Sequence, residues 1–131
     1  MHKGLLKAGA IFGALAVILG AFAAHALRSR LLPDQLAIFE TAVRYQMYQA
    51  FAILISGILY KEFPFKTTIL AGKFFILGII IFSGSLYMLT YFKAVANEGM
   101  FWLGAVTPVG GTLMIAGWLL VLRIFYIKRA H

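Results

Sequence analysis

Four apolar segments, each about 20–25 residues long, limit the folds open to this chain more than any other feature. They cover residues 5–26, 36–60, 68–92 and 101–126. At about 1.5 Å per residue, each can cross the roughly 30 Å hydrocarbon core of a bilayer. No segment alternates with a period of two, and a spanning barrel needs more strands than 131 residues supply. The pattern predicts an all-α integral membrane protein: a four-helix bundle of four transmembrane helices with short loops, forming one domain.

The composition agrees with a membrane protein. Only 12% of the residues are charged and the mean hydropathy is +0.93, whereas soluble domains carry about 25% charged residues. The net charge of +8 is spread singly or in pairs between apolar runs, so we expect no nucleic-acid partner. The chain has no cysteine, which excludes disulfides, thiol catalysis and cysteine-ligated metals.

Short polar stretches connect the apolar segments. They are RSRLLPD (28–34), KEFPFK (61–66) and KAVANEG (93–99). Asp34 is expected to cap the second helix just after the preceding proline. Pro64 is expected to end the helix before it.

The first segment also has features of a cleaved signal peptide. The chain begins with MHKGLLK, and AHA (24–26) matches the small-x-small cleavage pattern. The apolar run is longer than the 7–15 residues usual in signal peptides, and it is patterned on one face. We therefore expect this helix to be retained.

Lys and Arg are distributed unevenly between the two ends of the predicted bundle, eight to four. Cytoplasmic loops carry the excess of basic residues, and four crossings place both termini on one side. The sequence predicts a multi-pass protein of the cell (inner) membrane with both termini cytoplasmic. The larger group is Lys3, Lys7, Lys61, Lys66, Lys73, Arg123, Lys128 and Arg129, and the smaller is Arg28, Arg30, Arg44 and Lys93.

The first segment separates its residues by size. Gly9, Gly13, Ala16, Gly20 and Ala24 fall within one narrow arc of the helix. Close backbone approach at small residues drives helix association in lipid, and GAIFG is also a G-x-x-x-G pattern. Two interpretations stay open: contact inside one bundle, or self-association of two chains.

The fourth segment contains GAVTPVGG (104–111), with small residues Gly104 and Gly111 suited to packing. Pro108 cannot donate to the carbonyl of Gly104, which Thr107 or water would then satisfy. One interpretation is a helix break that forms a hinge or exposes carbonyls to a cation. The other is a tolerated kink.

The stretch FETAVRYQMYQ places a polar group at the head of the second helix. Glu40 and Arg44 have the favourable i,i+4 order for an ion pair, and Tyr48 and Gln49 share one broad arc with Arg44. His25, across a short loop, is expected at similar depth. One interpretation is an interfacial ion pair that anchors the helix. The other is a polar pocket or ion path.

No enzyme signature is present. The other histidines, His2 and His131, are terminal, so no internal histidine cluster is available for a metal. No serine lies in a G-x-S-x-G elbow, and no Gly-rich loop joins a strand to a helix. We expect a protein that is not an enzyme and has no cofactor or metal.

Several strings closely resemble the membrane-protein family known as domain of unknown function 423. The resemblance implies a small multi-pass membrane protein without an established activity. Two positions depart from the family pattern: Gln49 stands where a His is expected, and Ala23 where a Gly is expected. The first departure weakens any metal-ligand or proton-relay scheme at that site. The strings are LGAFAAHAL (19–27), FETAVRYQMYQAFAIL (39–54), FSGSLYML (82–89) and LGAVTPVGGTLMIAGWLL (103–120).

Three hypotheses for function follow. The first is a non-catalytic bundle in the lipid bilayer that forms a homo-oligomer or supports another membrane protein. The second is a small-solute or ion carrier or channel that uses His25, Glu40 and Arg44 and works as an oligomer. The third is lipid or quinone binding in a groove lined by Tyr45, Tyr48 and Trp102.

Overall fold

The computed structural model describes residues 1–128, apart from the side chain of Glu98, so Arg129 and His131 lie outside the described residues. Four long helical rods account for most of the chain, and their ends fall within three residues of the predicted segments. The elements are α1 (Lys3–Phe22), η1 (Ala23–Leu27), α2 (Pro33–Leu59), α3 (Lys66–Gly78), η2 (Ile79–Ser83), α4 (Gly84–Ala94), η3 (Glu98–Met100) and α5 (Leu103–Ile124).

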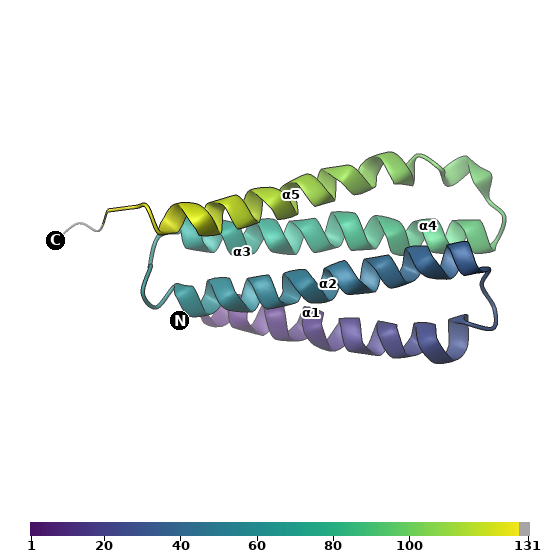
Figure 1. The fold of residues 1–131 in the computed structure, drawn as a ribbon, viewed down its shortest axis with the longest axis horizontal. Helices are drawn as coiled ribbons and strands as arrows, with labels where there is room; N and C mark the ends of the chain where they lie inside the picture. Colours follow the sequence, from purple (N-terminus) through teal and green to yellow (C-terminus); the bar gives the residue numbers. More distant parts are fainter. Residues whose placement is uncertain (129–131) are drawn as a thin grey trace.

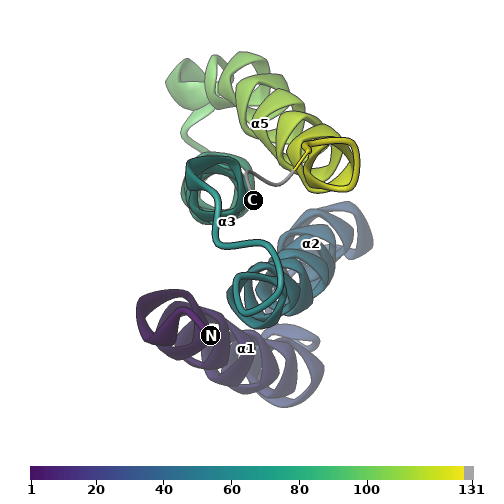
Figure 2. The same cartoon turned by 90° about the vertical axis from the view of Figure 1, so that its left-hand side faces the viewer.

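The rods lie side by side, and consecutive rods run in opposite directions (Figure 1). The short π-helices η1 and η2 continue their neighbours, so α1–η1 is one rod and α3–η2–α4 is another. α1 packs mainly on α2, and α5 packs mainly on α3–η2–α4. Figure 2 shows α1 and α5 on opposite sides of the bundle, with α2 and α3 between them.

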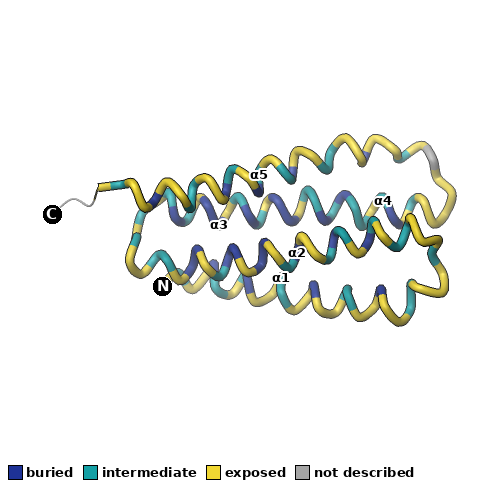
Figure 3. Tube along the Cα trace, viewed as in Figure 1, coloured by how far each residue is buried: buried dark blue, intermediate teal, exposed yellow. Residues whose placement is uncertain are grey.

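Burial follows this order. The dark, buried residues lie mostly along α2 and α3–α4, whereas α1 and α5 are largely exposed (Figure 3). The exposed residues of the outer helices include Ile18 and Leu119, which are 62% and 60% exposed. Large apolar side chains on an outer surface suit lipid rather than water. The apolar core consists of Leu5, Ala52, Ile53, Ala71, Phe75, Ile79 and Met114.

Three of the four rods are long and apolar enough to cross a membrane: Lys3–Leu27, Lys66–Ala94 and Leu103–Ile124. α2 is not among them. It carries Asp34 and Glu40 as well as Arg44, together with several glutamines, and these lower its hydropathy. Hydropathy therefore supports three of the four predicted spans, and it does not by itself support α2 as the fourth.

The start of α2 differs from the prediction. Pro33 is the first helical residue and Leu32 precedes it, so Asp34 lies in the first turn and is not the cap. The local hydrogen bond comes from Gln35, whose Oε1 accepts from the Leu32 N–H at 3.1 Å. Its Nε2 donates to the Lys93 carbonyl at 3.3 Å, which ties this loop to the end of α4.

Of the two interpretations at Pro108, the helix break is wrong, because α5 continues through this residue from Leu103 to Ile124. Proline removes one backbone hydrogen bond, and this proline lies in the second turn, so the rest of the helix keeps its bonds. Thr107 does not turn to Gly104 as predicted. Its Oγ1 lies 3.1 Å from the Leu103 carbonyl and 2.7 Å from Ser85 Oγ on α4.

His2 has a structural role that the sequence analysis did not identify. Its Nδ1 accepts from the Leu5 N–H at 3.1 Å and so caps α1. The backbone N–H of His2 donates to the Gly57 carbonyl at 2.9 Å, and the imidazole ring packs edge-to-face with the Tyr60 ring. The chain start is thereby held against the end of α2.

Replacing His2 with alanine should lower the free energy of unfolding by about 1 kcal/mol, because the first turn of α1 loses its side-chain cap. Unfolding by denaturant in detergent micelles would measure this change. His2→Asn, which keeps a capping acceptor, should retain most of the stability. Equal losses in both variants would show that the ring contact with Tyr60, and not the cap, is what matters.

Candidate functional site at the middle of the bundle

The small-residue face of α1 packs against α2 of the same chain. A Cβ added at Gly9 would lie 2.7 Å from Leu54 Cγ and 3.1 Å from the Ala50 carbonyl oxygen, so any larger residue would require Leu54 to shift. Further along the helix, a Cβ added at Gly13 would lie 3.9 Å from Ala50 Cβ, and one added at Gly20 would lie 3.4 Å from Val43 Cγ1. Most of this face therefore packs within the bundle, which supports the first of the two interpretations, while Ala24 at its end is exposed. The facing pairs are Gly9 with Leu54, Gly13 with Ala50, and Gly20 with Val43.

On α5 the glycine in closest contact is not one that the sequence analysis chose. Nothing lies within 4 Å of a Cβ added at Gly104, and at Gly111 the nearest atom is Phe82 Cδ2 at 3.7 Å. At Gly110 an added Cβ would collide with the backbone of Phe82, in the π-helix η2. The π-helix and Gly110 together form the closest approach between α5 and its neighbour.

A buried polar layer crosses the bundle between α1, α2 and α4. Gln46 on α2 is only 3% exposed. Its Nε2 donates to the Phe12 carbonyl at 2.9 Å, and its Oε1 accepts from Tyr87 Oη at 2.7 Å. One turn away, Ser83 Oγ donates to the Ala42 carbonyl at 2.7 Å. Buried polar groups in lipid need such partners, so these bonds fix how the three helices fit together.

Gln49 belongs to this interior, which corrects its predicted place beside Tyr48. Its side chain is 5% exposed, and its Oε1 has no hydrogen-bond partner among the described residues. The sequence held a signal for this arrangement. Ala42, Gln46, Gln49 and Ile53 recur at spacings of four, three and four, as residues on one packing seam do. Polarity hid the seam, because Gln49 was grouped with the polar residues around Arg44.

The opposite face of α2 points outward and carries Glu40, Arg44, Tyr45 and Tyr48, all of them exposed. The predicted ion pair is not formed: Arg44 Nη2 instead contacts Thr41 Oγ1 at 3.3 Å. Within the described chain neither charge has a partner of opposite sign. Two long exposed side chains gain little from pairing at a surface, so nothing in the monomer holds them together.

The predicted cluster with His25 is not assembled. His25 is exposed in η1, and no described hydrogen bond joins it to Glu40 or Arg44. Val43 lies beside Gly20, so His25 is about five residues, or roughly 8 Å, from the level of Arg44. A cavity of about 340 Å³ includes Glu40 but neither His25 nor Arg44.

The predicted groove between Tyr45, Tyr48 and Trp102 is also not seen in the described structure. The Tyr45 ring packs against Phe82 at a tilt of 45° with ring centres 4.8 Å apart, and it meets the Tyr48 ring edge-on at 5.6 Å. Trp102 lies just before α5 and is 49% exposed. These three residues line none of the four described cavities.

Comparison with known proteins gives the family. Residues 19–111 match the family described as "Protein of unknown function (DUF423)". This region contains Gly20 and Ala24 of the small-residue face, all of α2, and Gly110. No solved structure matches the chain.

Relatives over nearly the full length are named only as UPF0382 membrane proteins. One from Staphylococcus haemolyticus is 39% identical over 114 residues, which are 87% of this chain and 88% of that protein. YwdK of Bacillus subtilis is 36% identical over 120 residues, covering 91% of this chain and 93% of the relative. A Haemophilus influenzae relative is 36% identical, with 91% and 90% covered. With its all-helical fold and three apolar rods, the chain belongs to this family of multi-pass membrane proteins of unknown function.

Proposed function

We propose that the chain is a non-catalytic, four-span component of the cell membrane that associates with a second copy of itself through the outward face of α2. The observation that carries this proposal is Arg44. It is exposed on the bundle surface, has no acidic partner in the described chain, and lies near the middle of the helices. A charge in that position needs an acidic partner, and the described part of the monomer does not supply one.

Two contacts support the central depth of Arg44. Residues 8–27 of the α1 rod contain no Lys, Arg, Asp or Glu, and this stretch of about 30 Å fits the hydrocarbon core. Val43 of α2 packs beside Gly20, which lies near the middle of this charge-free stretch. In the α3–α4 rod the corresponding stretch is 74–92, and Ser83 at its midpoint bonds to Ala42. Both registers support a position for the Arg44 turn close to the bilayer centre.

The same registers support α2 as the fourth span despite its low hydropathy. α2 packs along α1 and along α3–η2–α4, so it lies at the same depth in the bilayer as these two rods. Four crossings then put both termini on one side. That side carries eight of the twelve basic residues and one of the four acidic residues, which supports cytoplasmic termini in the inner membrane.

Self-association would remove the cost of the exposed charge. A charged side chain at the bilayer centre costs about 2.5–3.5 kcal/mol on insertion scales. A two-fold axis along the membrane normal brings Glu40 of each copy toward Arg44 of the other, since two-fold contacts are reciprocal. The two residues are one turn, about 6 Å, apart in height, which the arginine side chain can span. Tyr45 and Tyr48 would border these pairs.

Charge reversal tests this pairing. Glu40→Arg and Arg44→Glu should each weaken dimerisation at least about tenfold, because each places like charges together across the interface. The double variant should recover to within about threefold of wild type. Because the chain has no cysteine, Tyr48→Cys supplies a reporter, and disulfide formation between copies in native membranes measures the dimer.

Ile115→Cys on the outer face of α5 is the matched control, since this residue is 63% exposed but lies away from the proposed interface. It should cross-link weakly, with no response to the charge variants. Equal cross-linking at both cysteines, or a double variant no better than the single ones, would contradict the pairing. A monomer that purifies with a different membrane protein would replace self-association by support of a partner.

A further inference from the structure

We propose that the outer face of the first two turns of α3 binds the headgroup of an anionic phospholipid, with its phosphate held between Lys66 and Lys73. This proposal rests on the membrane placement of the α3–α4 rod and is independent of the self-association through α2. The two surfaces have different residues and lie at different depths.

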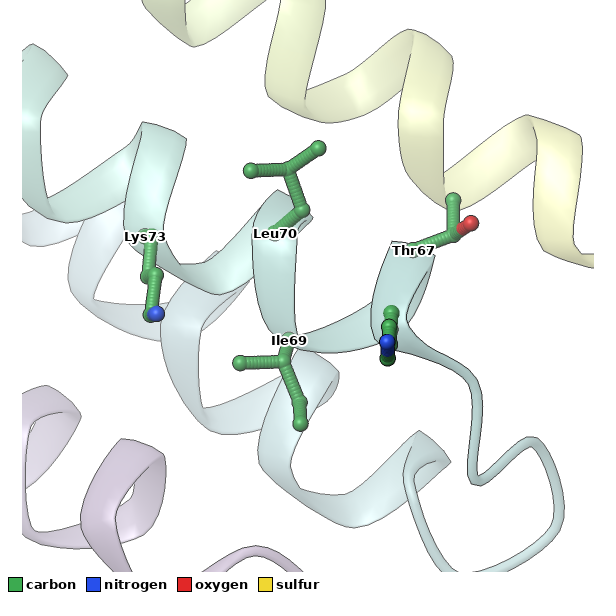
Figure 4. Close-up of a pocket in the computed structure, with 5 residues that line it drawn as sticks. Thr67, Ile69, Leu70 and Lys73 are labelled. Atoms are coloured by element: carbon green, nitrogen blue, oxygen red, sulfur yellow. The ribbon is translucent and has the colours of Figure 1, made fainter.

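The residues form one continuous arc of α3. At 3.6 residues per turn, Lys66 and Lys73 lie only about 20° apart around the helix axis, two turns apart along it. Ile69 lies on one side of this line, and Leu70 and Thr67 lie on the other, as Figure 4 shows for the labelled side chains. The five residues line an open cavity of about 380 Å³. Two cations therefore stand above one another in a hollow with apolar edges.

The depth of this hollow matches a lipid headgroup. Lys73 is the last charged residue before the stretch 74–92, which fills the hydrocarbon core. It therefore stands at the core boundary, and Lys66 lies about 10 Å further out, in the headgroup layer. Ile69 and Leu70 lie between the two lysines, in the interfacial layer just outside the hydrocarbon core. Lysine commonly places its stem along apolar surface with the ammonium at this boundary.

Charge complementarity selects an anion as the occupant. Neither ammonium has an acidic or hydrogen-bonding partner among the described residues, and both side chains are exposed. The residue before the helix, Phe65, offers no side-chain cap, and the N-terminal end of a helix favours negative charge nearby. Basic pockets at the cytoplasmic ends of membrane helices bind anionic headgroups in this manner.

The test uses the full chain purified in detergent and titrated with phosphatidylglycerol, with bound lipid counted by native mass spectrometry. Wild type should retain one phosphatidylglycerol in preference to phosphatidylcholine. Removing a lysine near an anionic lipid costs about fivefold in affinity. Lys66→Gln with Lys73→Gln should therefore weaken phosphatidylglycerol binding about 25-fold, and the double Lys→Arg variant should keep it.

Lys3→Gln with Lys7→Gln is the matched control. It removes the same charge at the same end of the bundle, and Lys7 likewise precedes a charge-free stretch, but neither residue lines the cavity. This control should bind as wild type does. An equal loss in both double variants would reduce the effect to general surface charge and overturn the site. Equal binding of phosphatidylcholine, or displacement of the lipid by millimolar inorganic phosphate, would overturn the lipid assignment.

Discussion

Replacing Gly110 with alanine is expected to lower the free energy of unfolding by about 1–3 kcal/mol, the usual cost of forcing an extra methyl group into a packed interior. The new Cβ would collide with the Phe82 amide nitrogen and lie 2.8 Å from its Cα. These are backbone atoms of η2, so they cannot move aside as a flexible side chain does. α5 and the α3–η2–α4 rod would have to separate along their contact.

Gly104→Ala is the matched control for this substitution. It makes the same chemical change in the same helix, at a position where nothing lies within 4 Å of the added Cβ. Unfolding of both variants in mixed micelles, followed by circular dichroism, measures the difference. Gly104→Ala should be neutral or slightly stabilising, because alanine is the better helix former. Equal stability of the two variants would show that α5 and η2 are not held at this distance.

Removing the Tyr87 hydroxyl with Tyr87→Phe is expected to cost about 0.6 kcal/mol, the measured average for hydrogen bonds between membrane helices, and at most about 1.7 kcal/mol. Gln46 Oε1 would lose its donor while remaining buried. Gln46→Ala should cost more, about 2–4 kcal/mol. It removes the bond to Tyr87 and the bond to the Phe12 carbonyl, and it also leaves a cavity.

A double-mutant cycle separates these contributions. If the hydrogen bond between Gln46 and Tyr87 is the coupling, the double variant should be more stable than the sum of the single losses predicts, by about the energy of that bond. Tyr91→Phe is the control, because Tyr91 is 63% exposed and its hydroxyl makes no described hydrogen bond. Additive losses for Gln46 and Tyr87 would mean that each acts through packing alone.

The sequence predicted the helices well because apolar length is a local property. The Lys66–Ala94 rod was expected as 68–92, and its ends are set by residues that lie within the same stretch. The start of α2 was less well predicted. Whether Asp34 or Gln35 supplies the local hydrogen bond depends on which residue begins the helix. Because α2 begins at Pro33 and its cap is Leu32, the side chain that bonds back to the cap is that of Gln35.

The candidate site was predicted less well than the fold. Glu40 and Arg44 were recognised as unusual from their charge, but their pairing was wrong because spacing on one helix does not fix two flexible side chains. Gln49 was assigned to the wrong face because its polarity grouped it with Arg44 and Tyr48, although its spacing from Ala42 and Ile53 follows the interior seam. Gly110 was missed in favour of Gly104 and Gly111. Only the position of η2 shows which of these three glycines lies against the Phe82 backbone.

By itself, the sequence determined an all-helical membrane protein, its four helical segments and the uneven charge of its two ends. Helix formation and membrane affinity depend on residues within one segment, so these features need no information about neighbours. The tertiary structure decided which face of α2 is interior, where α5 comes closest to η2, and that Arg44 is exposed near the middle of α2 with no acidic partner among the described residues. These are relations between segments far apart in the chain, and only packing brings those segments together.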